Sequence, residues 1–75
     1  MTLAEAKIKK EYRIKNITEG AGSQRLFEFG FTQGVRLCVE QIAPFHGAML
    51  ICIRKSLVVL DFATADLIAV EEVRV

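Results

Sequence analysis

The sequence of 75 residues contains no tryptophan, one proline, one histidine and only two cysteines. The near absence of proline argues against a disordered or repeat-built chain. Neither sign of charge is in large excess, because ten basic and nine acidic side chains leave a net charge of +1. No strong electrostatic field is therefore available to attract nucleic acid or an anionic membrane, and we expect partners to be recognised by shape.

Long apolar runs are missing too. The longest, residues 48–53 and 57–60, fall far short of the roughly 20 residues that cross a bilayer. The N-terminal stretch MTLAEAKIKKEYR carries charges where a signal peptide would need an apolar core. The sequence therefore predicts a cytoplasmic protein that does not insert into the membrane and whose two cysteines are free thiols.

Apolar residues are plentiful, at 52% of the chain. A chain this short is expected to form a single domain, residues 1–75, and to bury only about 60–65% of the surface that it exposes when unfolded. Its core must therefore be dense. We expect the core to include Ile14, Leu26, Phe29, Leu37, Val39, Ile51, Ile53, Val59, Leu60 and Ile68.

Alternation of apolar and polar side chains predicts five strands. They are expected in residues 12–17, 35–42, 48–53, 57–60 and 68–73, with a turn at 43–47 and a short helical turn at 63–66. The continuous apolar run at 57–60 is typical of a strand that is covered on both faces. Five short strands with short connections indicate a mainly β fold, either a small barrel or a closed sandwich.

One clear helix interrupts the strands. Ser23 is the expected N-cap and Gly30 the expected left-handed C-cap. Leu26 and Phe29, three residues apart, share one face, so a helix laid across the open end of the barrel would point both into the core. Gly34 would then let the chain turn tightly into the second strand.

The segment RLFEFGFTQGVRLCV, residues 25–39, resembles the signature of the FeoA family, in which an Arg-Leu pair, a hydrophobe and two glycines four residues apart lead into a strand. The resemblance covers the whole chain, with further matches at Tyr12, Ile14, Ile17, Ala43, Pro44, Gly47, Leu60, Ala65, Ile68 and Val70. It implies a five-stranded SH3-like barrel with one short α-helix between strands 1 and 2 that caps the barrel.

The resemblance also implies a function. FeoA-like proteins are small cytosolic proteins of bacterial ferrous iron uptake, thought to assist the membrane transporter FeoB by binding its GTP-hydrolysing cytoplasmic region. The same fold occurs as the C-terminal domain of metal-dependent repressors, so the alternative is an SH3-like interaction or dimerisation module linked to metal-dependent transcription regulation. A repressor needs a DNA-reading helical domain, for which this chain has no room. The oligomeric state stays open.

We expect no enzyme, because the sequence has neither the spacing of a catalytic triad nor a phosphate-binding loop. No cofactor or metal site is predicted either. His46 is expected to be a solvated turn residue, because a metal site needs three or four converging donors. Cys38 and Cys52 are expected close together on one face of a hairpin, as small side chains that strands tolerate, with iron contact or redox sensing as alternatives. The isolated protein is expected to bind no stoichiometric ferrous iron.

A basic cluster near the N-terminus raises the possibility of RNA binding. It comprises Lys7, Lys9, Lys10, Arg13 and Lys15. Few aromatic residues accompany it, and Glu71 and Glu72 in the last strand are expected beside the first strand. A solvated, partly neutralised face is therefore predicted, without nucleic acid.

The candidate partner-binding residues begin with Phe27. It lies about 100° around the helix from Leu26, so it should be partly exposed. Exposed aromatics often anchor partners, and Arg25 and Glu28 would form a polar rim around it. Packing over the following turn near Phe31 is the alternative. Changing Phe27 to serine is expected to weaken transporter association at least tenfold, about 1.4 kcal/mol.

A second candidate surface is Asp61 with Phe62. The FeoA pattern favours a basic residue where Asp61 stands in this sequence. A reversed charge at that position would alter the complementarity of a docking site. If Phe27 is not a contact, the partner surface is therefore expected around Asp61 and Phe62.

Overall fold

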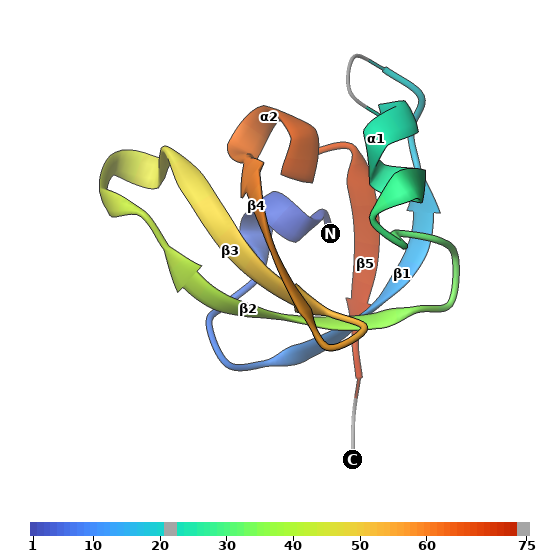
Figure 1. The fold of residues 1–75 in the computed structure, drawn as a ribbon. Coiled ribbons are helices and arrows are strands. Elements are labelled where there is room, and N and C mark those ends of the chain that lie inside the picture. The colour runs from blue at the N-terminus through green and yellow to red at the C-terminus, as the bar shows by residue number, and fades with distance from the viewer. Residues whose placement is uncertain (21–22, 74–75) are drawn as a thin grey trace.

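The protein is built on one antiparallel sheet of five strands, in a computed structural model that describes residues 1–20 and 23–73 (Figure 1). The order across the sheet is β4-β3-β2-β1-β5. The strands are β1 (Glu11–Ile17), β2 (Arg36–Ile42), β3 (Ala48–Ile53), β4 (Ser56–Asp61) and β5 (Ile68–Glu72). These ranges confirm the five strands that the alternating pattern predicts.

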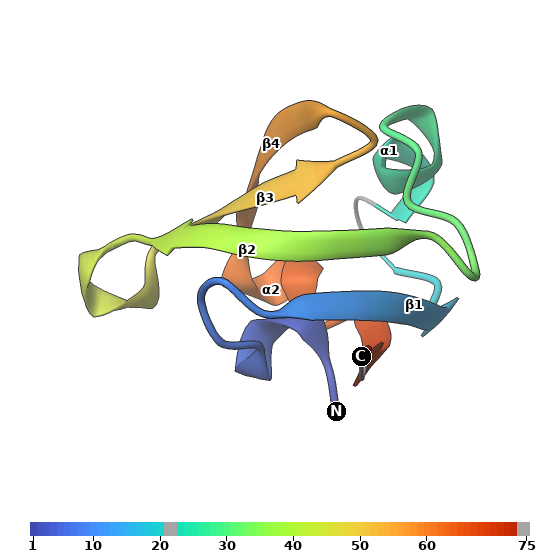
Figure 2. The same cartoon turned by 90° about the horizontal axis from the view of Figure 1, so that it is seen from below.

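One short helix precedes β1 and three lie in connections between strands. They are η1 (Leu3–Glu5), α1 (Ser23–Glu28), η2 (Pro44–His46) and α2 (Phe62–Ala65). Figure 2 shows α1 beside the turn that joins β3 to β4, where a Cβ added to Gly30 would lie 3.0 Å from Cδ of Arg54. Within the described ranges, no helix is long and apolar enough to cross a membrane.

The expected closed barrel is not formed, because the sheet stays open with β4 and β5 as its two edges. The chain between these edge strands forms α2, which lies between their upper ends in Figure 1. A barrel would need a ladder of backbone hydrogen bonds at this place. The fold is therefore a mainly β, open sheet, and the edge of β4 is left next to α1.

Burial confirms eight of the ten predicted core residues and corrects two. Phe29 is 45% exposed and Val59 is 68% exposed. Half of the core formed by the described residues was not predicted, including residues ahead of the first strand. These eight buried side chains are Leu3, Ala6, Tyr12, Phe31, Met49, Val58, Ala65 and Val70.

Phe29 is exposed because the helix ends in a way that brings Phe31 inward instead. The backbone N–H of Gly30 donates to the carbonyl of Phe27 at 3.1 Å, and that of Phe31 donates to the carbonyl of Leu26 at 2.9 Å. This pair of bonds is the Schellman motif, in which a left-handed residue lets the chain reverse. Gly30 has φ of +90°, which confirms its predicted conformation. Leu26 and Phe31 are both fully buried, as the hydrophobic contact of that motif requires.

Strand β4 is covered on one face only, which corrects the prediction for the apolar run at 57–60. Val58 and Leu60 are buried, whereas Leu57 is 63% exposed. As an edge strand, β4 has its inner face on the core and its outer face toward solvent. The run hides an ordinary alternation, because both faces of the strand happen to carry apolar residues.

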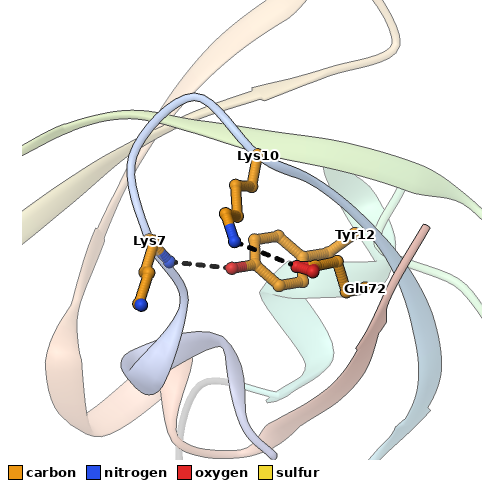
Figure 3. Close-up of polar contacts among 4 residues, drawn as sticks. All are labelled: Lys7, Lys10, Tyr12 and Glu72. Carbon is orange, nitrogen blue, oxygen red and sulfur yellow. Dashed lines mark hydrogen bonds and ion pairs between the residues drawn. The ribbon is translucent and has the colours of Figure 1, made fainter. Parts of the chain in front are cut away.

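The N-terminal segment is attached to the sheet by Tyr12, whose hydroxyl oxygen accepts a hydrogen bond from the backbone N–H of Lys7 at 2.9 Å (Figure 3). Beside it, the ammonium of Lys10 lies 3.3 Å from the carboxylate of Glu72. Glu71 is opposite Arg13 in the ladder between β1 and β5. These placements confirm that acidic residues of the last strand lie beside the basic cluster.

Candidate functional site

A groove of 280 Å³ lies between α1 and the edge strand β4. Helix α1 forms one wall and the end of β4 with the start of α2 forms the other. The lining residues are Arg25, Leu26, Phe29, Val59, Leu60, Asp61 and Thr64. The groove exists because the sheet is open at β4, so that a helix side chain and an edge strand face each other without a strand between them.

The groove has apolar walls and a charge of each sign. Phe29 and Val59 supply exposed apolar surface from the two sides. The guanidinium carbon of Arg25 lies 6.0 Å from the centre of the Phe29 ring, within reach of a cation–π interaction. Asp61 supplies the acidic group. Such a surface suits a partner that brings an apolar side chain flanked by polar groups.

Asp61 is held in place by capping α2. Its carboxylate oxygen accepts a hydrogen bond from the backbone N–H of Thr64 at 3.1 Å. Hydrogen bonding to the Thr64 side chain, followed by this backbone bond, favours the ionised carboxylate and lowers the pKa of Asp61 below its ordinary value of 3.8. The acidic group of the groove is therefore fixed by the backbone of α2.

We expect the contribution of this cap to stability to depend on pH in acid. It is fully present above the unfolded-state pKa of 3.8 and is lost as the pH falls through the lower folded-state pKa, because the unfolded chain takes up the proton first. Thermal melts at a series of pH values should show wild type losing more stability in acid than Asp61→Asn, which keeps an uncharged cap. Parallel acid profiles for the two proteins would contradict this role.

The structure brings together only two of the five residues that the sequence proposed for partner binding. Arg25 and Asp61 line the groove. Phe27 is 57% exposed, as expected, but it lies in a shallower depression with Glu19, Gly20, Ser23 and Gln24. Glu28 is exposed on α1. Phe62 is half-buried, and its ring lies edge-on to that of His46, with the two ring centroids 5.2 Å apart. None of these three is among the described residues that line the groove.

Sequence reasoning missed Phe29, Val59 and Thr64 as groove residues. The signal for Phe29 was the glycine that follows it, since a Schellman motif pairs the residue after the glycine with the last helical turn. The signal for Val59 was Asp61, because side chains two apart in a strand share a face and a charge marks that face as solvated. Thr64 had no comparable signal in the sequence.

A second group of reactive side chains lies on the outer face of the sheet. Cys38 is directly opposite Cys52 in the ladder between β2 and β3, which confirms their expected proximity, and both are free. The thiol of Cys38 donates to a carboxylate oxygen of Glu40 at 3.3 Å. Burial, followed by this hydrogen bond and the nearby Cys52, raises the pKa of Cys38 to about 11. Its resting form is therefore the thiol.

Residues 1–72 match a family model described as FeoA domain. No curated protein sequence matches the chain. Among solved structures, the FeoA protein of Chlorobium tepidum is 21% identical with a TM-score of 0.89, over 99% of this chain and 71% of that one.

Two further solved structures are similar. Iron(II) transport protein A of Clostridium thermocellum is 30% identical with a TM-score of 0.90, over 97% of this chain and 46% of that one. FeoA of Stenotrophomonas maltophilia, complexed with zinc and described as a prokaryotic SH3 domain protein, is 22% identical with a TM-score of 0.84, over 95% of this chain and 89% of that one. These likenesses show an SH3-like fold.

Proposed function

We propose, because the chain belongs to the FeoA family, that it takes part in bacterial ferrous iron transport as an accessory protein. Its activity is binding: it docks onto the cytoplasmic, GTP-hydrolysing region of a FeoB-like transporter. The similar proteins named for iron(II) transport and the family match support the role in iron transport. The groove between α1 and β4 carries the docking part of the proposal.

The groove fits a protein partner better than a small molecule. Its apolar side chains, Phe29 and Val59, are exposed in the free protein. Exposed apolar side chains surrounded by polar ones mark protein interaction surfaces. Burial of the phenyl ring and the valine against a partner would supply a large part of the binding energy, with Arg25 and Asp61 setting the orientation.

The proposed docking surface includes Phe27 if it continues around α1 beyond the groove. Phe27 lies on α1, two residues before Phe29 at the helix end, but it lines the neighbouring depression. A partner that covered both depressions would bury two aromatic rings, one on α1 and one directly after it. A partner confined to the groove would leave Phe27 in water. The two aromatic residues therefore separate a broad docking face from a narrow one.

Binding of the purified transporter cytoplasmic region to single variants tests the proposal. Phe29→Ser and Val59→Ser should each weaken binding at least tenfold, about 1.4 kcal/mol. Leu57→Ser is the matched control, because Leu57 is an exposed apolar residue of the same strand and lies outside the groove lining. It should bind like wild type. Phe27→Ser then shows whether the docking face is broad.

The outcomes separate the function from the surface. If wild type binds the transporter region and the groove variants bind equally well, the function stands and the docking face lies elsewhere. If folded wild type recovers no ferrous iron transporter from membranes and does not bind its cytoplasmic region, the accessory role is wrong. Circular dichroism of each variant confirms that lost binding is not lost folding.

A further inference from the structure

We propose that Cys38, Cys52 and Glu40 form a binding site for a thiophilic divalent cation, with zinc as the ion that fits best. Their ligand atoms, two sulfurs and one carboxylate oxygen, all lie within 4.8 Å of one another. No metal site was predicted from the sequence, where the cysteine pair was interpreted as small side chains that strands tolerate, with iron contact or redox sensing as alternatives. The tertiary structure brings the Glu40 carboxylate to the pair as a third donor, and the proposal does not depend on the groove or on the transporter.

A β-bulge brings the third donor into place. In the ladder between β2 and β3, Val39 pairs with Ile51 while Gln41 pairs with the next residue, Leu50. Glu40 is therefore the extra residue of β2 at this point. A bulge bends its strand and redirects a side chain, and bulges are frequent next to functional sites. Here the Glu40 carboxylate comes within hydrogen-bonding distance of the Cys38 thiol.

The cysteine pair is set by the register of the sheet. Directly opposed residues of antiparallel strands have Cβ atoms about 4.5–5.5 Å apart and point to the same face. Cys38 and Cys52 occupy such a pair and face away from the core. Both are half-buried, so an ion would be partly shielded from water and still open to solvent on one side.

The dimensions suit zinc. Zinc binds thiolate at about 2.3 Å, which separates two sulfurs of a tetrahedral site by about 3.8 Å. Because the ligand atoms already lie within 4.8 Å of one another, the two sulfurs need to approach by no more than about 1 Å. Such a shift is within the range of side-chain rotation at half-buried positions. Three protein ligands leave the fourth position for water or for a group from outside.

The ligand set also selects the metal. Two thiolates and one carboxylate favour zinc over the hard cations magnesium and calcium, and zinc binds more tightly than ferrous iron in the general order of divalent metals. A bound divalent cation deprotonates a coordinating thiol, which would displace the proton that Cys38 now donates to Glu40. The expectation that the isolated protein binds no stoichiometric ferrous iron is kept, and the site is assigned to a softer ion.

Anaerobic titration of the reduced, full-length protein with zinc, read against a chromogenic chelator, tests the site. Wild type should bind one zinc ion with micromolar affinity or better. Cys38→Ser and Cys52→Ser should each bind at least about a hundredfold more weakly, because a hydroxyl is a poor zinc ligand compared with a thiolate. Glu40→Gln should bind more weakly as well. Glu71→Gln, which changes a carboxylate of β5, is the matched control and should bind like wild type.

Cobalt substitution and alkylation give independent readouts. Cobalt-loaded wild type should show a thiolate-to-cobalt charge-transfer band that is weaker in each single serine variant, which keeps one thiolate, and absent from the double serine variant. If a serine variant fails to fold, alkylation of the wild-type protein tests the site instead. One equivalent of zinc should then protect both cysteines from iodoacetamide. Zinc that binds equally well to a double serine variant, or that shields neither thiol, would overturn the proposal.

Discussion

Phe31→Ala should lower the free energy of unfolding by about 3–5 kcal/mol, whereas Phe29→Ala should lower it by about 1 kcal/mol or less. Phe31 is completely buried, and its removal leaves a cavity that the packed core cannot fill. Phe29 is 45% exposed in the groove, so its truncation mainly removes the contact with Arg25. Urea denaturation of the three proteins measures the difference directly.

The two phenylalanines are a matched pair, since they flank one glycine and differ chiefly in burial. A domain of this size has only about 5–15 kcal/mol of stability, so Phe31→Ala removes a large fraction of it. If that variant does not fold at all, Phe31→Leu, which restores part of the volume, should recover a cooperative transition. Equal losses for Phe29→Ala and Phe31→Ala would show that the helix end does not direct Phe31 into the core.

Leu26→Ala should lower the free energy of unfolding by about 2–5 kcal/mol. Leu26 is 1% exposed and is the buried residue of α1, so this side chain attaches the helix to the core. Because α1 is only six residues long, fewer than two turns, it is too short to be stable by itself and depends on that contact. The groove wall formed by α1 should loosen with it, and binding of a partner there should weaken in parallel.

Phe27→Ala is the control for Leu26→Ala, because it truncates an exposed residue at the next position of the same helix. It should change stability by less than about 1 kcal/mol. Thermal melts of the two variants and of wild type measure the difference. A Leu26→Ala protein with the melting temperature of wild type would mean that α1 is not packed against the core.

Alternation and the glycine positions were enough to predict the order and approximate bounds of the five strands and of α1. Each strand carries apolar side chains at every second position on its inner face, and this period is local information. Gly30 and Gly34 have φ of +90° and +88°, a conformation that few other residues adopt. The cross-strand neighbours Cys38 and Cys52 followed from one hairpin of predictable register.

Local patterns could not decide which apolar side chains would remain outside. Phe29 and Val59 were predicted to be core residues because both are apolar and lie within or next to a predicted element. Phe29 instead follows the end of a helix, and Val59 lies on the outer face of an edge strand. Whether a strand is central or at an edge is a property of the whole sheet. The groove is made by these two exceptions, so the candidate site was the part that the sequence predicted least well.

The sequence by itself thus determined the strands, the helix, the glycine turns and the family, all of which depend on residues near one another in the chain or on their order. Only the tertiary structure decided that the sheet stays open at β4, that α1 faces this edge, and that a bulge brings Glu40 to the cysteine pair. The physical reason is the same in each case. These features depend on how distant segments pair and pack. The alternating pattern of a single strand does not determine which strands it pairs with across the sheet.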